Sequence, residues 1–132
     1  MKFHHFGMAV YAFEPALGFF KRLGYSATDP VTDPLQDVEL IMCKSEHQPD
    51  VELIRPLSES SPVSDFLKKN QEMIYHPCYQ VTEIEEALKT NFRGMRVLRV
   101  SPPKPAILFD KYPVAFFFVK GIGLIELLEK PH

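Results

Sequence analysis

The sequence lacks any long apolar run and any strong excess of charge. No stretch approaches the roughly 20 apolar residues of a membrane-spanning helix, and the opening residues lack the apolar core of a secretory signal peptide. A net charge of −2 gives no reason to expect a nucleic acid or a membrane surface as partner. Two cysteines are too few for a disulfide framework, so we expect a protein of the reducing cytoplasm.

What remains is an ordinary globular composition. A chain of 132 residues with 45% hydrophobic and 24% charged residues is long enough for one core but not for two independent domains. The twelve prolines are about twice the usual share, and they lie at the edges of segments, where they separate short strands. We therefore predict a single domain over residues 1–132.

The most informative feature is an internal repeat. The segment HFGMAV at 5–10 is echoed by HPCYQV at 76–81, and VELI at 51–54 is echoed by IELL at 125–128. Each copy therefore carries one histidine and one glutamate in matching places. A duplicated module that supplies one imidazole and one carboxylate per copy suggests a metal site where the two copies face each other.

The hydrophobic pattern predicts strand, helix and further strands in each copy. The expected elements of the first copy are a strand at 2–10, a helix at 13–23, and strands at 37–43 and 49–55. Those of the second copy are a strand at 75–81, a helix at 83–92, and strands around 96–100, 106–109, 114–119 and 123–129. We expect modules at 1–57 and 74–132, joined by a linker at 58–73. The linker is expected to be structured, because Ser61 and Pro62 are typical of a helix start.

The two glutamates of the repeat lie inside apolar strands. Burying a carboxylate without a partner costs several kcal/mol, so a nearby cation or hydrogen-bond donor is expected. The alternative is that Glu52 and Glu126 point to solvent from half-exposed strands. On the histidine strand, Gly7 and Ala9 share the face of His5, and such small residues leave room on that face.

Five segments in order resemble a known family. They are HHFGMAV at 4–10, VELIRPL at 51–57, SPV at 61–63, YH at 75–76 and GLIELLE at 123–129. Together they resemble the vicinal oxygen chelate superfamily, which contains glyoxalases, bleomycin resistance proteins and extradiol dioxygenases. The likeness spans nearly the whole chain and is nearest to the methylmalonyl-CoA epimerase-like and lactoylglutathione lyase-like branch.

The resemblance implies an α+β fold in which two βαβββ modules form a curved mixed sheet around a metal-binding cleft. It also implies that the metal ligands are His5, Glu52, His76 and Glu126. Two imidazoles and two carboxylates suit a divalent ion such as Zn, Ni, Co or Mn.

For such an enzyme we expect proton abstraction next to a carbonyl, in the manner of a lyase, isomerase or epimerase. The proton would be moved by Glu126, Glu52 or Glu39. Glu39 has two interpretations, an acid/base residue facing the cavity or an edge carboxylate. The expected substrate is a small thioester or 2-oxo compound, and the expected assembly is a homodimer.

Two other functions are compatible with such a fold. One is a metal-independent protein of the bleomycin-resistance kind that binds a small molecule without chemistry. The presence of all four ligand types argues against it. The other is an Fe(II) extradiol-type dioxygenase, which would use two histidines and one glutamate. Glu52 would then occupy a position that such an enzyme leaves open.

Overall fold

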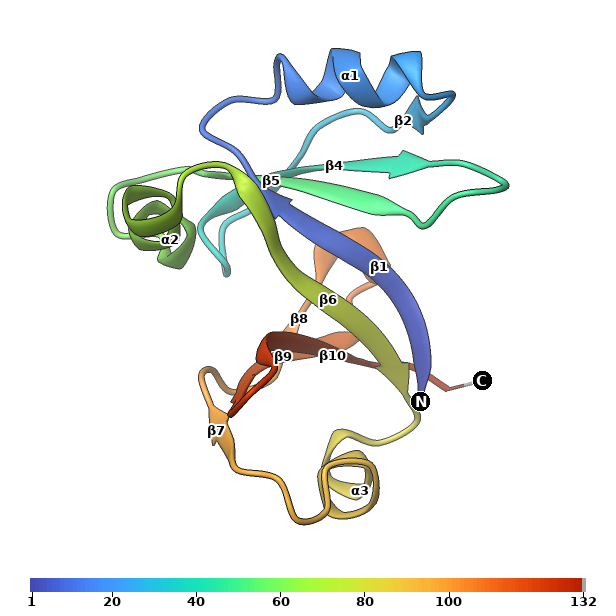
Figure 1. The fold of residues 1–132 in the computed structure, drawn as a ribbon, viewed down its shortest axis with the longest axis vertical. Coiled ribbons are helices and arrows are strands. Elements are labelled where there is room, and N and C mark those ends of the chain that lie inside the picture. Colours follow the sequence, from blue (N-terminus) through green and yellow to red (C-terminus); the bar gives the residue numbers. More distant parts are fainter. Residues whose placement is uncertain (132) are drawn as a thin grey trace. The chain divides into compact units, whose positions relative to one another are not determined.

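The computed structural model describes residues 1–131, and the chain divides into two compact units. The first unit runs from His5 to Tyr75, and the second combines residues 1–4 with the chain from His76 onward. Both units consist of strands covered by a helix, so the predicted α+β class is confirmed (Figure 1). None of the helices in the described chain is both long and apolar enough to cross a membrane.

In the first unit, one helix covers a small mixed sheet. Its elements are β1 (Lys2–Ala9) from His5 onward, α1 (Ala16–Arg22), β2 (Ser26–Ala27), β3 (Val31–Asp33), β4 (Val38–Lys44) and β5 (Val51–Pro56). The strand β5 pairs in parallel with β1 and antiparallel with β4, and β2 and β3 both pair with the far side of β4. A further helix, α2 (Pro62–Asn70), follows β5 and begins at Ser61, whose hydroxyl accepts the amide hydrogen of Val63.

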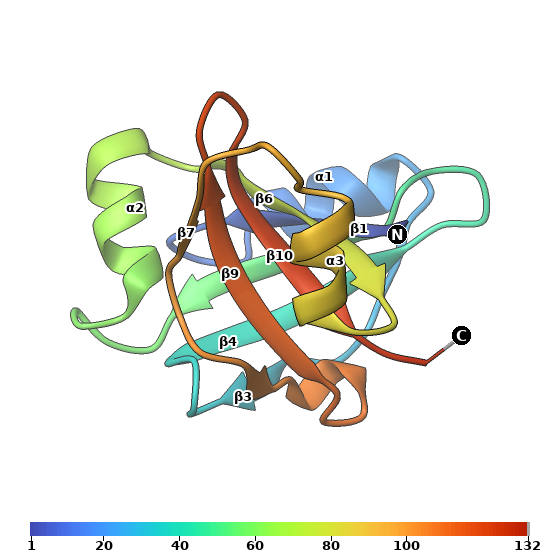
Figure 2. The ribbon, with the colours of Figure 1, turned by 90° about the horizontal axis from the view of Figure 1, so that it is seen from below.

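The second unit repeats this arrangement strand for strand. Its elements are β6 (Met73–Val81) from His76 onward, α3 (Ile84–Thr90), β7 (Val97–Arg99), β8 (Lys104–Pro105), a 3₁₀ turn (Ile107–Phe109), β9 (Pro113–Val119) and β10 (Gly123–Glu129). The strand β10 pairs in parallel with β6 and antiparallel with β9, and β7 and β8 both pair with β9. In Figure 2, α3 crosses β10 of the same unit.

Each sheet has one face that forms a core with its helix. In the first unit, Ile41, Cys43 and Leu53 pack against α1. In the second, Phe117 and Leu127 pack with others against α3. Since side chains alternate along a strand, the residues between these core positions point to the opposite face. We call that opposite face the inner face of each unit.

Most predicted elements are present, but one strand is wrong. Residues 106–109 do not form a strand; Ile107–Phe109 is a 3₁₀ turn in which the Phe109 amide donates a 3.0 Å hydrogen bond to the Ala106 carbonyl oxygen. The apolar side chains of this segment led to the prediction of a strand. They are apolar because Phe109 packs against a buried cluster that includes Ala106 and Val114. Three short strands, β2, β3 and β8, were not predicted, because prolines lie beside or within them and none exceeds three residues.

Candidate metal centre

In the first unit, the strand register brings His5 and Glu52 together on the inner face. Glu52 lies directly opposite Gly7 in the parallel pair of β5 and β1, and His5 precedes Gly7 by two residues on the same face. The His5 Nε2 atom is 3.6 Å from the Glu52 Oε1 atom. Both residues are buried, His5 completely and Glu52 with 4% of its surface exposed.

The second unit places His76 and Glu126 by the same register. Glu126 lies directly opposite Cys78 in the parallel pair of β10 and β6, and His76 precedes Cys78 by two residues. His76 and Glu126 are also buried, with 1% and 3% exposed. The sequence repeat therefore corresponds to a repeat of structure, in which each unit buries one imidazole and one carboxylate on its inner face.

Two contacts orient the imidazole of His76. Its ring meets the ring of Phe116 edge-on, with the centroids 4.9 Å apart, and Phe116 lies directly opposite Glu126 in the register of β9 and β10. Its Nδ1 atom lies 3.3 Å from the Pro77 carbonyl oxygen. A proton on Nδ1 can be donated to that oxygen, and Nε2 then carries the lone pair that a metal ion requires.

The four side chains fit a divalent metal ion chemically. His5, Glu52, His76 and Glu126 are residue types that can ligate one, and all four are buried. The alternative that Glu52 and Glu126 point to solvent is therefore wrong. Buried carboxylates are costly unless a cation or donors compensate for the lost water, and a pair of imidazole and carboxylate donors suits borderline metals such as Zn, Ni, Co or Mn.

Glu39 lies on the other side of the sheet from Glu52. In the register of β4 and β5 it is opposite Arg55, on the face that packs against α1, whereas Met42 is opposite Glu52 on the inner face. The Arg55 Nε atom donates a 2.8 Å hydrogen bond to the Glu39 carboxylate, and the guanidinium also lies over the ring of Phe13. This placement favours the edge-carboxylate interpretation of Glu39.

Sequence reasoning missed Asp33 as a candidate. Asp33 lies opposite Val38, on the inner face of the first unit, and only 2% of its surface is exposed. Its carboxylate accepts hydrogen bonds from the backbone amide and the side-chain amide of Gln36, at 3.3 and 2.9 Å. In the sequence, an aspartate followed by proline is typical of a turn, which concealed its burial. The available signal was that Asp33 follows the apolar Val31 by two residues, so that both would share one face of a strand.

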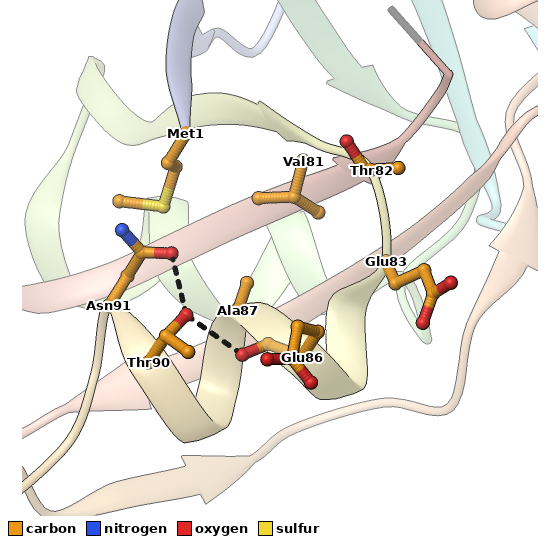
Figure 3. A pocket seen from close by; sticks show the side chains of 8 residues that line it. All are labelled: Met1, Val81, Thr82, Glu83, Glu86, Ala87, Thr90 and Asn91. Atoms are coloured by element: carbon orange, nitrogen blue, oxygen red, sulfur yellow. Dashed lines mark hydrogen bonds between the residues drawn. The ribbon is translucent and has the colours of Figure 1, made fainter.

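A separate hollow lies beside α3 in the second unit (Figure 3). It is lined by Met1, Val81, Thr82, Glu83, Glu86, Ala87, Thr90 and Asn91. The Thr90 hydroxyl donates a 2.9 Å hydrogen bond to the Glu86 carbonyl oxygen, so this polar group is already satisfied within the helix. The hollow contains no histidine, and its two glutamates are exposed, so it does not have the character of a metal site.

Comparison with known proteins gives a consistent family. Residues 4–116 match the model of the Glyoxalase/Bleomycin resistance protein/Dioxygenase superfamily. A mitochondrial methylmalonyl-CoA epimerase of Dictyostelium discoideum is 30% identical over 98% of this chain and 78% of its own. An ethylmalonyl-CoA/methylmalonyl-CoA epimerase of Cereibacter sphaeroides is 33% identical over 96% of both chains.

A solved structure shares the fold. The crystal structure of methylmalonyl-CoA epimerase from Mycobacterium tuberculosis superimposes with a TM-score of 0.79, at 20% identity, over 99% of this chain and 88% of that one. The resemblance and the α+β fold of paired modules expected from the sequence are therefore confirmed. The expected class, an enzyme of the lyase, isomerase or epimerase type, is confirmed as well.

Proposed function

Because this chain belongs to the Glyoxalase/Bleomycin resistance protein/Dioxygenase superfamily, we propose that it is a divalent-metal-dependent epimerase of a CoA thioester. One observation carries the proposal. Each unit buries a histidine and a glutamate on its inner face in the same register. Burying a carboxylate costs stability unless a cation or hydrogen-bond donors compensate, so this repeated burial points to a function rather than to folding. The names of the curated relatives supply the substrate class, a short acyl-CoA with a carboxylate on the carbon next to the thioester.

We propose that the two pairs, His5 with Glu52 and His76 with Glu126, together hold one divalent ion. A single pair supplies two ligands, whereas catalytic zinc-type sites use at least three protein ligands. When bound, such an ion stabilises the negative charge that develops on substrate oxygens after deprotonation. Zn, Ni, Co and Mn all suit this set of donors, and the proposal includes each of them.

The proton at the carbon next to the carbonyl would be taken by a carboxylate of the chain. We assign this step to Glu126, because it is buried, with 3% of its surface exposed, and lies directly opposite Phe116, so water has little access to its carboxylate. Epimerisation returns a proton to the opposite side of the same carbon, so a second acid/base group is needed. Asp33 is our candidate, because its buried carboxylate shares the inner face of Glu52.

The alternatives from the sequence have less support. A lactoylglutathione lyase-like reaction on a 2-oxo compound uses the same proton chemistry, but the curated relatives named above are epimerases of CoA thioesters. A metal-independent resistance protein does not need two buried carboxylates. An Fe(II) dioxygenase does not need the second one. We also retain two further predictions, a homodimer and a cytoplasmic location. Cys43 and Cys78 are buried and form no disulfide within residues 1–131, which suits a reducing compartment.

The test is exchange of the substrate proton. With a divalent metal present, the protein should exchange the α-proton of methylmalonyl-CoA for deuterium, observed by NMR, and metal analysis should find one ion per chain. The substitution Glu126→Ala should abolish the exchange and weaken metal binding together, because it removes both a base and a ligand. The control is Glu46→Ala, which removes an exposed glutamate of a turn.

Two results contradict the proposal. If the wild-type protein binds no Zn, Ni, Co or Mn stoichiometrically, the enzyme assignment is wrong. If Glu126→Ala leaves both exchange and metal content at the level of Glu46→Ala, the metal site is assigned to the wrong residues.

A further inference from the structure

On the inner face of the second unit, an exposed apolar row lies next to the row of Glu126. In the register, Phe116 is opposite Glu126. Two residues further along β9, on the same face, Phe118 is opposite both Leu98 of β7 and Leu124 of β10. Phe118 is 50% exposed and Leu98 is 67% exposed. We call Leu98, Phe118 and Leu124 the apolar row. Large apolar side chains exposed side by side indicate a binding surface more often than single exposed ones do.

Two residues beyond the apolar row, the same face of β7 and β9 continues into a pair of positively charged residues, Arg96 and Lys120. The Lys120 amide donates a 3.0 Å hydrogen bond to the Arg96 carbonyl oxygen, which continues the pairing of Val119 with Val97 by one residue. Arg96 and Lys120 are therefore opposite each other, and the alternation of the strands puts them on the inner face. Like charges opposite each other are destabilising. Both side chains are exposed, and neither forms an ion pair within residues 1–131.

The first unit shows that the fold does not require this composition. The positions that correspond to the apolar row are Ser26, Lys44 and Asp50, since Lys44 is opposite Ser26 and is two residues beyond Met42, the partner of Glu52. There the Lys44 Nζ atom forms a 3.3 Å ion pair with the Asp50 carboxylate. The same place in the same architecture is thus polar and neutralised in one unit, and apolar and exposed in the other.

We propose that this surface of the second unit binds the coenzyme A portion of the substrate. The pantetheine arm lies along the apolar row, and a phosphate group of the nucleotide lies between Arg96 and Lys120. This inference rests on the proposed function, because it takes the thioester substrate from there. It adds the residues that recognise the arm and the phosphate.

The order of the rows matches the order of groups in the substrate. From the reacting carbon outward, an acyl-CoA has the thioester, an arm with alkyl segments and then anionic phosphates. From Glu126 outward, the inner face has Phe116, the apolar row and then the two cations. From Phe116 to Lys120 is four residues of strand, or about 14 Å. A phosphate between Arg96 and Lys120 also removes their mutual repulsion.

The first experiment measures binding of free coenzyme A by calorimetry. The variant Arg96→Gln with Lys120→Gln should bind it about tenfold more weakly or worse, because charge-assisted contacts to a phosphate are lost. The matched control, Lys69→Gln with Lys89→Gln, removes two exposed lysines elsewhere and should bind within twofold of wild type.

The second experiment distinguishes recognition of the coenzyme A portion from catalysis at the thioester. The variant with both Arg96 and Lys120 replaced should have a raised KM for methylmalonyl-CoA. For the short N-acetylcysteamine thioester, which has no phosphate, its kinetics should be unchanged. Replacing the apolar row with the polar type of the first unit, Leu98→Ser with Phe118→Ser, should raise the KM for methylmalonyl-CoA about tenfold.

The outcomes distinguish the inference from the proposed function. If the wild type binds coenzyme A but turns over neither thioester, the surface is supported and the epimerase assignment is wrong. If the wild type is active but the charge variant binds coenzyme A as tightly as the lysine control, the inference is overturned. If Leu98→Ser with Phe118→Ser changes the sedimentation of the protein and leaves coenzyme A affinity intact, the row is an interface between copies, and the inference is also overturned.

Discussion

The two units present the same buried pair but differ in what surrounds it. Both place a glutamate opposite the residue two positions after a histidine, and both pack the other face of the sheet against one helix. Beside the pair, the first unit has an ion pair between Lys44 and Asp50, whereas the second has the exposed apolar row. The difference teaches that the buried histidine and glutamate are common to both units, whereas the neighbouring positions differ.

This difference suggests that the glutamates of the two units have different roles. If the second unit carries the substrate surface, its glutamate is the one next to the reacting carbon, and the glutamate of the first unit serves chiefly as a ligand. At the position directly opposite the glutamate, the first unit has Met42 and the second has Phe116. The comparison of the units is therefore testable at matched positions.

The largest expected difference is between Glu126→Gln and Glu52→Gln. An amide oxygen can still contact a metal ion but cannot accept the α-proton. Glu126→Gln should therefore lower the rate of deuterium exchange by roughly 10²–10⁴-fold. Glu52→Gln should chiefly weaken metal binding and should recover exchange when the metal concentration is raised. Metal titrations followed by NMR exchange measure both effects. Equal loss in the two variants at saturating metal would remove the functional asymmetry that we infer.

The next difference is between two acids of the first unit, Asp33 and Glu39. Asp33→Asn should slow epimerisation by roughly 10²-fold, the lower end for a proton-transfer residue, while the exchange that Glu126 performs on one epimer continues. Glu39→Gln should leave turnover and metal content unchanged and cost about 0.2–1 kcal/mol, as for a partly exposed ion pair. Chiral analysis of the product and urea unfolding measure these effects. If Asp33→Asn epimerises the substrate as fast as the wild type, Asp33 is not the second acid/base group, and its role is the structural one of bonding to Gln36 in the turn.

The smallest difference is expected in the two cores. Leu53 and Leu127 each follow the glutamate of their unit by one residue, and both are fully buried. Replacing either by alanine should lower the free energy of unfolding by about 3 kcal/mol, because a methyl-lined cavity remains. Urea unfolding of Leu53→Ala and Leu127→Ala should show similar losses. A loss in one variant more than about 2 kcal/mol larger than in the other would show that the units differ in packing as well as in surface.

Periodicity and the repeat were sufficient to predict the elements that carry the site. The matching strands around His5, Glu52, His76 and Glu126 are long, apolar and bounded by turn residues, so their pattern is unambiguous. The likeness of the two copies also predicted the equivalence of their histidines and glutamates. That prediction agrees with the strand register, since the partners of Glu52 and Glu126 are Gly7 and Cys78.

Features that depend on contacts between distant segments could not be predicted. The burial of Asp33 depends on its pairing with Val38 across a turn, and the local sequence indicates only the turn. The role of Glu39 depends on which strand partner, Arg55, lies opposite it. The apolar row is composed of three residues from three strands, so no local window contains its pattern.

The outermost strand is broken in both units. In the first, Pro30 separates β2 from β3, and in the second, Pro102 and Pro103 separate β7 from β8. Each remaining piece is two or three residues long. A long, continuous outer strand would offer a row of unpaired amide and carbonyl groups to a neighbouring chain, whereas proline supplies no amide hydrogen and short pieces offer few sites. The interruptions therefore protect both units from edge-to-edge aggregation, which leaves their apolar surfaces available for ligands.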